Sequence, residues 1–326
     1  MFDPNNLPYQ DPKTSRRVAY VTGANGGAGY YITLHLYMHG WVVYMGCRSE
    51  DKARRAKADI EKEANERKEK LPSNAVFGEL RIASIDMARL QSVEEAAQWL
   101  LKNEPGLDLL INNAGVMAVP AETTEDGFDI QLQTNHLSPF LLTHRLLPLL
   151  KQSPNGPRVV FVSSMGYLLS WLTKEDSLSG NFNKFPDVFW TWVRYGNSKV
   201  AEIHASKIFA AKHPDILTMS VHPGVSAETE LARWWNDLPY LGPSFKFLFK
   251  NVVGKLVGCS AEDLSHPPLR AGADPSLTIE KDNGGFLADH GKETALWNCA
   301  SNTKYCQNTW DWTIKTLNEK GHKIDE

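Results

Sequence analysis

Short apolar runs alternate with longer amphipathic segments along most of this chain, and this alternation limits the folds that it can adopt. The runs are rich in β-branched and aromatic residues, which favours buried strands. They cover residues 17–21, 41–45, 80–84, 107–111, 158–162 and 217–221. The segments between them predict helices over residues 27–38, 49–68, 92–102, 128–150 and 192–212. Regular strand–helix order predicts an α/β fold: one domain over residues 1–326, with a doubly wound parallel sheet and helices on both faces.

The composition is that of a globular protein with a large core and no strong electrostatic field. Hydrophobic residues make up 42% of the 326 residues and charged residues 22%. The formal net charge of −3 provides no basic excess for binding the phosphates of nucleic acid. The four cysteines lack the spacing of a zinc site. We therefore predict no metal, and we expect a reducing compartment.

The sequence contains no recognisable targeting or spanning segment. Its first residues have neither the apolar core of a signal peptide nor an Arg- and Ser-rich transit pattern. No apolar run reaches the length of about 18 residues that a spanning helix needs. We therefore expect a soluble protein of the cytoplasm.

A glycine-rich turn follows the first predicted strand and opens a helix. Gly23, Gly27 and Gly29, with Asn25 between them, allow a tight turn and close approach of the backbone to a pyrophosphate. The helix N-terminus would present free N–H groups to the phosphates. A glycine-rich turn without a ligand is the alternative. The position after the first strand favours a dinucleotide site.

The residues that end the second and third strands bear on the identity of the cofactor. An NAD site usually places an acid after the second strand, and positions 46 and 47 hold none. Arg48 offers a guanidinium to a 2′-phosphate, which predicts NADP(H). The alternative is a solvated arginine at a helix start. Asp86, at the end of the third strand, could bind the adenine amino group or cap the next helix.

A tyrosine and a lysine four residues apart are the candidate catalytic pair. Tyr195 and Lys199 would lie one turn apart on one face of a predicted helix. Tyr9 and Lys13 have the same spacing, but they lie in a proline-interrupted segment with no strand before it. A preceding strand that ends in Ser163-Ser164 favours the pair at 195 and 199.

Together, these motifs resemble the short-chain dehydrogenase/reductase family over nearly the whole chain. The ordered set comprises the glycine-rich turn, Asp86, residues 112–115, Asn135, Ser164, Tyr195, Lys199 and residues 222–224. The resemblance implies an oxidoreductase that moves a hydride to or from a carbonyl carbon. It also assigns Asn113, Ala114, Gly115, Pro223 and Gly224 to the cofactor site. Thr229 comes one residue later than is usual in the family, and it is the candidate for binding the nicotinamide carboxamide.

The family resemblance gives the catalytic residues their expected roles. A phenol with a pKa of about 10 is a slow acid–base catalyst at neutral pH, and we expect the Lys199 ammonium to lower the pKa of Tyr195. Lys199 would also bind the nicotinamide ribose. Ser164 would donate a hydrogen bond to the substrate oxygen, where charge develops. Ser163 is the alternative to Ser164.

Three further polar residues need an interpretation. Asn135 matches the family asparagine that holds a water beside the lysine, and a role in kinking its helix is compatible with this. His136 and His204 match no catalytic position of the family. We expect both histidines to be structural.

Two apolar, aromatic inserts are expected on the substrate side, at about residues 165–194 and 226–275. They predict a pocket for bulky apolar carbonyl substrates, with ordinary packing as the alternative. Residues 241–257 interleave apolar side chains with Lys246, Lys250 and Lys255. This pattern is also typical of a helix lying in a lipid interface.

Several distinctive segments resemble, within the family, fungal oxidoreductases associated with lipid droplets and vacuolar morphology. They are residues 3–4, 7–9, 34–40, 117–120, 131–135, 189–192 and 280–284. This resemblance implies a peripheral contact with a membrane or a lipid droplet. Family members often form homodimers, although the long C-terminal segment could cover those faces.

The leading hypothesis is an NADPH-dependent reductase of ketones and aldehydes, reversible as an alcohol dehydrogenase, with Tyr195 as general acid. One alternative is an oxidoreductase docked on a lipid surface that acts on a lipid, sterol or retinoid-like substrate. Another is a slow NADP-binding sensor. The complete set of Ser164, Tyr195 and Lys199 argues against an inert site.

Overall fold

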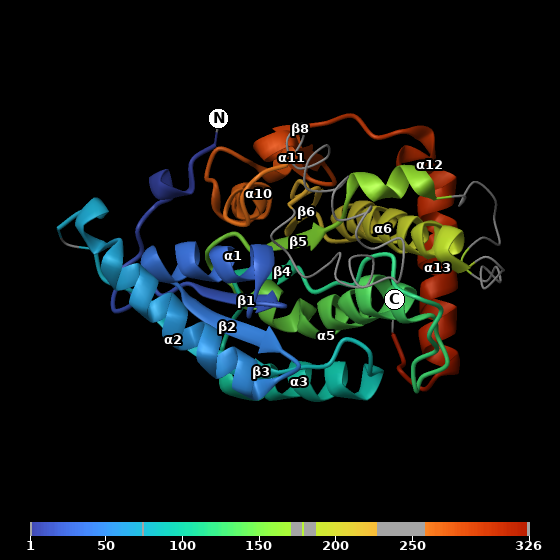
Figure 1. Cartoon of the computed structure of the whole chain (residues 1–326), viewed down its shortest axis with the longest axis horizontal. Coiled ribbons are helices and arrows are strands. Elements are labelled where there is room, and N and C mark those ends of the chain that lie inside the picture. The colour runs from blue at the N-terminus through green and yellow to red at the C-terminus, as the bar shows by residue number, and fades with distance from the viewer. Residues whose placement is uncertain (1, 74, 171–177, 179–186, 227–257, 325–326) are drawn as a thin grey trace, which may run out of the picture.

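The computed structural model describes residues 2–73, 75–170, 178, 187–226 and 258–324 (Figure 1). All six predicted strands are present in one eight-stranded sheet, with the order β3-β2-β1-β4-β5-β6-β7-β8. The strands are β1 (Val18–Thr22), β2 (Val42–Cys47), β3 (Glu79–Ser84), β4 (Leu109–Asn112), β5 (Arg158–Val162), β6 (Leu217–Val221), β7 (Phe286–Ala288) and β8 (Lys292–Glu293). Neighbours are parallel except β7 and β8, which are antiparallel. The strand order reverses between β1 and β4, and such a point creates a ligand crevice at the carboxyl ends of the strands.

Helices cover both faces of the sheet, as predicted. On one face, α1 (Gly27–Met38), α2 (Glu50–Glu66) and α10 (His266–Ala273) contribute to one hydrophobic core. On the other, α3 (Leu90–Asn103), α5 (Ser138–Gln152) and α6 (Asp187–Lys212) contribute to a second core. The shorter helices are η1 (Pro4–Asn6), η2 (Lys68–Lys70), α4 (Ile130–Leu132), η3 (Gln133–Leu137), η4 (Met165–Leu169), η7 (Asp263–Ser265), α11 (Ile279–Asp282), η8 (Asp289–Gly291) and α12 (Asn298–Ser301). The α/β doubly wound fold is therefore confirmed.

The C-terminal part of the chain adds elements that the sequence did not predict. The last helix, α13 (Thr303–Glu319), packs across α6 at one side of the molecule (Figure 1). Its Trp310 is 1% exposed and its ring lies 4.8 Å from those of Phe140 and Phe209. Helix α13 therefore extends the core beneath α5 and α6. Within the range predicted as the second insert, α10 lies on the sheet, where Leu269 and Ala271 are buried.

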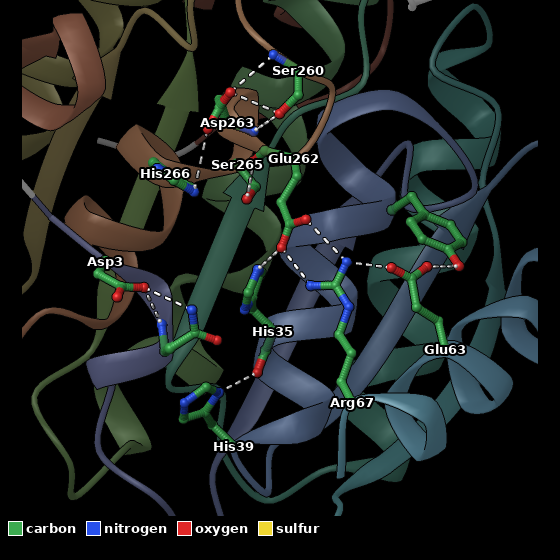
Figure 2. A network of polar contacts seen from close by, with 12 residues as sticks. Asp3, His35, His39, Glu63, Arg67, Ser260, Glu262, Asp263, Ser265 and His266 are labelled. Atoms are coloured by element: carbon green, nitrogen blue, oxygen red, sulfur yellow. Dashed lines mark hydrogen bonds and ion pairs between the residues drawn. The ribbon is translucent and has the colours of Figure 1, made fainter. Parts of the chain in front are cut away.

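A polar network fastens the segment before α10 to the helix of the glycine-rich turn (Figure 2). Glu262, next to η7, accepts hydrogen bonds from Arg67 at 2.5 and 3.0 Å, and its Oε1 lies 2.9 Å from Nε2 of His35 on α1. Arg67, at the end of α2, also pairs with Glu63. A segment about 200 residues further along the chain is thus held to α1 and α2. No helix in the described ranges has both the length and the apolar character needed to cross a membrane.

Candidate active site

The glycine-rich turn lies between β1 and α1 and has the backbone geometry that its glycines were predicted to allow. Gly23 and Gly27 have φ values of 67° and 53°, a region that side chains disfavour. A β-carbon on Gly29 would lie 2.2 Å from the Gly23 oxygen, so the helix start packs tightly on the turn. The N-cap residue of α1, Gly26, supplies no side-chain cap. The first N–H groups of α1 are thus available to an anion.

The turn after β4 packs against the glycine-rich turn. The Asn113 side chain donates to the Thr22 carbonyl oxygen at 2.9 Å. The Asn113 and Ala114 N–H groups both donate to the Thr22 hydroxyl at 2.9 Å. The side chain of Asn113 therefore joins the turn after β4 to the end of β1. This leaves the backbone of the turn as the part that can contact a cofactor. A β-carbon on Gly115 would lie 3.1 Å from Oδ1 of Asn135 and 3.6 Å from Nζ of Lys199.

The ends of β2 and β3 place the residues that were predicted to select the cofactor. Arg48 is exposed directly after β2, and no ion pair to it occurs in the described ranges. Cys47 is buried beneath the turn, where burial raises its pKa to about 11 and the N–H groups of Ala24 and Asn25 lower it. Asp86 accepts a hydrogen bond from the Ala88 N–H at 3.0 Å. It forms a turn, and the N-cap of α3 is a different residue, Arg89.

Tyr195 and Lys199 lie on α6 with exposures of 6% and 5%. The Lys199 Nζ lies 5.8 Å from the centroid of the Tyr195 ring. The Ser164 side chain acts on the Tyr195 phenol and lowers its pKa, and the Ser164 hydroxyl also accepts from the Gly166 N–H at 3.0 Å. The structure thus brings the serine, tyrosine and lysine of the predicted set together.

The electrostatic balance at Tyr195 differs from the sequence-based expectation. Burial raises the pKa of the Tyr195 phenol above its ordinary value. The Lys199 charge lowers this pKa, as expected, and Ser164 lowers it too, but burial outweighs both. The direction expected for Lys199 is therefore confirmed, and the net rise comes from the loss of solvent around the phenol, which the expectation did not include.

The two serines at the end of β5 are separated by their contacts. Ser163 is 2% exposed, and its hydroxyl donates to the Lys199 backbone oxygen at 2.7 Å. It therefore holds α6 against β5. Ser164 is partly exposed and faces Tyr195. The geometry favours Ser164 as the residue that can reach a substrate oxygen.

Asn135 lies in η3, a short π-helix that replaces the middle of the single helix predicted over residues 128–150. Its Oδ1 accepts from the Val116 N–H at 2.9 Å, and its Nδ2 donates to the Val116 oxygen and to the Ser198 hydroxyl at 2.9 and 2.8 Å. A π-helix is a common position for a kink, which agrees with the interpretation of Asn135 as a helix-kinking residue. Asn135 also links the β4 turn to the helix that carries Lys199.

His136, His204 and Tyr9, the tyrosine of the second pair with the catalytic spacing, all make contacts that stabilise the fold. His136 lies 2.8 Å from the Thr313 hydroxyl, and His204 lies 2.8 Å from the Thr309 hydroxyl. Both histidines therefore anchor α13. The Tyr9 ring stacks on His39 with centroids 4.5 Å apart.

After β6, Gly224 has a φ of 110°, and a β-carbon there would lie 3.0 Å from Sγ of Cys259. Gly224 follows Pro223 directly, and the chain continues into a parallel bridge between Val225 and Gly258. Thr229 and the whole of residues 241–257 lie outside the described residues.

Sequence reasoning missed three residues beside the catalytic pair. Glu202 pairs with Lys199, and the spacing of three residues on one helix could have indicated it. Gly166 lies so close to the Tyr195 ring that a β-carbon would come within 2.6 Å of Cε1. Trp192 meets the same ring edge-on, with centroids 6.2 Å apart. The spacing of three residues on α6 could have indicated the Trp192 contact as well, whereas no sequence signal indicates the Gly166 contact.

A glycine-rich phosphate turn at the strand-order reversal, next to a serine–tyrosine–lysine cluster, defines a dinucleotide-binding α/β oxidoreductase. Comparisons with known proteins agree. A model of the family described as short chain dehydrogenase matches residues 17–172. An uncharacterised oxidoreductase of Schizosaccharomyces pombe is 33% identical over 291 residues, covering 85% of this chain and 78% of that protein. The chain belongs to the short-chain dehydrogenase/reductase family, whose members bind a nicotinamide cofactor.

The chain is also similar to a retinol dehydrogenase in sequence and to a solved structure in fold. Human retinol dehydrogenase 14 is 36% identical over 222 residues, covering 67% of this chain and 63% of that protein. The crystal structure of an uncharacterised protein of Mycobacterium paratuberculosis superposes with a TM-score of 0.70 at 23% identity. That superposition covers 100% of this chain and 99% of the other, and it shows the shared fold.

Proposed function

We propose that this protein is an NADPH-dependent reductase of bulky apolar ketones and aldehydes, reversible as an alcohol dehydrogenase. The observation that carries the proposal is the cluster at Tyr195. Ser164 lowers the pKa of its phenol, and the Lys199 Nζ lies 5.8 Å from its ring centroid. This arrangement gives one proton donor, one hydrogen-bond donor for a developing oxyanion and one cation.

The residues at the carboxyl ends of the strands fit a dinucleotide phosphate. The uncapped start of α1 suits the pyrophosphate, and the exposed guanidinium of Arg48 suits a 2′-phosphate. When bound, NADPH supplies the hydride that reduces the carbonyl carbon. The Lys199 ammonium and the Gly115 backbone, which lie close together, would hold the nicotinamide ribose.

The side chains then manage the oxygen and its proton. The Ser164 hydroxyl donates a hydrogen bond to the carbonyl oxygen as negative charge develops there. The Tyr195 phenol gives its proton to that oxygen. The Lys199 ammonium stabilises the phenolate that remains. In the oxidative direction, the phenolate accepts the proton of the alcohol.

The surroundings of Tyr195 support an apolar substrate. Trp192 lies one turn before Tyr195 and is partly exposed. Leu169 and Phe189, from the predicted insert, are 45% and 55% exposed. By contrast, Tyr167 belongs to a buried cluster with Val200 and Phe286, as ordinary packing predicts. The likeness to retinol dehydrogenase 14 supports a retinoid or a related lipid as the alternative substrate class.

The test is a comparison of two tyrosine variants that share the same sequence spacing to a lysine. NADPH consumption is measured with retinal, dodecanal and acetophenone, and products are separated on a chiral column. Tyr195→Phe is expected to abolish turnover and to retain NADPH binding, whereas Tyr9→Phe is expected to remain active. Retained turnover in Tyr195→Phe would exclude the proposed acid.

Contact with a lipid surface is a separate part of the proposal. The exposed side chains of Leu169 and Phe189 support it. Flotation with neutral liposomes, carried out with and without residues 241–257, tests whether that segment docks. An absence of flotation, together with loss of activity on deletion, would assign the segment to the substrate site instead.

A further inference from the structure

A buried carboxyl group lies against the candidate catalytic lysine. Glu202 is 1% exposed, and its Oε2 and Oε1 lie 3.0 and 3.2 Å from Nζ of Lys199. The two residues are three positions apart on α6, so their side chains share one face of the helix. The reaction proposed above does not use this carboxyl group, and a buried acid beside a catalytic cation needs an explanation.

The hydrogen bonds of Lys199 indicate what Glu202 does to it. An ammonium has three N–H donors. The Val162 backbone oxygen accepts at 2.9 Å, and the two carboxyl oxygens of Glu202 accept at 3.0 and 3.2 Å. The Gly115 backbone approaches the same ammonium, since a β-carbon there would lie 3.6 Å from Nζ. Val162 and Glu202 therefore fix the position of the ammonium beside the turn that follows β4.

The charges of Lys199 and Glu202 both change the pKa of Tyr195. The Lys199 ammonium lowers the pKa of Tyr195, and the Glu202 carboxylate raises it. Burial raises the pKa of Glu202 well above the usual carboxyl range, while Lys199 lowers it. The carboxyl group is thus balanced between a neutral form and an ionised form that cancels the lysine charge.

No other ionisable group in the described ranges acts on Glu202 to a comparable degree. Titratable groups on the elements packed against α6 are Tyr167, His136, Arg158, Cys299, Lys304, Tyr305, Cys306, Asp311, Lys315 and Glu319. Those on α6 itself, besides the three discussed, are Asp187, Arg194, His204, Lys207 and Lys212. Lys199 is the one charge to which Glu202 responds.

We propose that Glu202 is a positioning residue that holds the Lys199 ammonium in place and, by gaining or losing its own proton, sets how much of that charge reaches the Tyr195 phenol. This inference rests on the function proposed above. When Glu202 is neutral, Lys199 acts on the phenol with its full charge. When Glu202 is ionised, the pair is close to neutral and the phenol keeps its proton to higher pH.

The test reads the titration of Tyr195 directly, so it needs no knowledge of the natural substrate. The full-length protein is labelled with carbon-13 at tyrosine Cζ, and the Tyr195 signal is assigned by its loss in Tyr195→Phe. Glu202→Gln keeps the shape and a hydrogen-bond acceptor but removes the charge. The Tyr195 pKa is expected to fall by about one unit in Glu202→Gln and to stay close to the wild-type value in Glu202→Asp.

A matched control comes from another buried acid that bonds to a tyrosine. Glu104 is 5% exposed and accepts from the Tyr44 hydroxyl at 2.5 Å. Glu104→Gln should leave the Tyr195 titration unchanged. An unchanged Tyr195 pKa in Glu202→Gln, with NADP binding and thermal unfolding close to wild type, would overturn the proposal.

Two further readouts keep the outcome clear. If Glu202→Gln does not fold, the wild-type Tyr195 signal must still change in two coupled steps, and a single step would overturn the inference. Activity separates this inference from the function on which it rests. Turnover by Tyr195→Phe would reject the function, whereas an inactive Tyr195→Phe with an unshifted Glu202→Gln would reject only the role of Glu202.

Discussion

Gly166 packs directly against the ring of Tyr195, and a β-carbon at position 166 would lie 2.6 Å from Cε1. The Gly166 N–H also donates to the Ser164 hydroxyl at 3.0 Å. One glycine in η4 thus positions both the candidate acid and the candidate oxyanion donor. Its lack of a side chain is a geometric requirement of the site.

Replacing Gly166 with alanine should therefore displace Tyr195 while leaving the distant cofactor turn intact. We expect Gly166→Ala to lower kcat/KM by about 100-fold, which corresponds to about 3 kcal/mol. NADPH binding, measured by fluorescence, should change little. Gly106→Ala is the control, because its nearest neighbours would lie 3.6 Å from the new carbon. Wild-type kcat/KM in Gly166→Ala would show that the ring does not need this space.

The exposed guanidinium of Arg48 should decide between the two nicotinamide cofactors. Arg48→Gln removes a charged partner of the 2′-phosphate, which is worth about 1.5–3 kcal/mol. We expect the KM for NADPH to rise by about 10- to 100-fold and the KM for NADH to change little. Arg55→Gln, an exposed arginine on α2, is the control. If the ratio of the two KM values is unaltered in Arg48→Gln, this arginine does not contact the cofactor.

Much of the fold could be predicted because the core strands are strongly patterned. The strands β1 to β6 and the helix α1 lie where the sequence placed them, within two residues at each end. The strands β7 and β8 have only three and two residues, too few to show a period. β7 pairs with the edge of β6 and β8 pairs with β7, and these pairings are set by the tertiary structure.

The sequence predicted which residues form the candidate site, but not how burial changes their pKa values. Ser164, Tyr195 and Lys199 come together as their motifs indicated. Spacing gives no measure of burial, however, so the raised pKa of Tyr195 could not be foreseen. At Asn135 the sequence predicted a kink, but it predicted neither the π-helix nor the bonds of its side chain to the Val116 backbone.

The position of Trp192 predicts an effect that depends on substrate size. Its ring meets that of Tyr195 edge-on, with centroids 6.2 Å apart. We expect Trp192→Ala to raise the KM for retinal by about 10-fold, from loss of roughly 1–2 kcal/mol of apolar contact, and to change the KM for acetaldehyde little. Trp99→Ala removes a half-exposed tryptophan on α3 and is the control. Equal changes in the KM values for retinal and acetaldehyde would show that Trp192 does not line the substrate pocket.

The network around Glu262 should contribute measurably to stability. The hydrogen bonds from His35 and Arg67 hold the pKa of Glu262 far below its usual range. A carboxyl pKa that folding lowers stabilises the protein above the unfolded pKa, and this stability is lost as the pH falls. Because the side chain is 31% exposed, we expect Glu262→Gln to lower the free energy of unfolding by only about 1 kcal/mol at neutral pH.

Urea unfolding at neutral pH measures this loss for Glu262→Gln. The control is Glu66→Gln, since the Glu66 side chain is 64% exposed and lies 3.9 Å from Lys62. Its unfolding free energy should stay within about 0.5 kcal/mol of wild type. If Glu262→Gln lowers the free energy of unfolding no more than Glu66→Gln does, the network around Glu262 adds no stability.

The two buried histidines under α13 predict sensitivity of the fold to acid. Burial lowers the pKa of His136 to about 3 and that of His204 to about 4. In the unfolded chain, both would bind protons near pH 6.5. Between these values the unfolded state carries more protons, so stability is present above about pH 6.5 and is lost as the pH falls toward the folded pKa values.

We therefore expect the free energy of unfolding to fall by roughly 2–4 kcal/mol between about pH 6.5 and 4. Because His136 and His204 bond to Thr313 and Thr309, α13 should detach first, which hydrogen exchange would detect. The double variant His136→Gln/His204→Gln should show a smaller loss with acid, although its stability at neutral pH will be lower. His290→Asn is the control, since His290 is exposed with a φ of 60° that asparagine tolerates. An identical acid dependence in the double variant would place the sensitivity elsewhere in the chain.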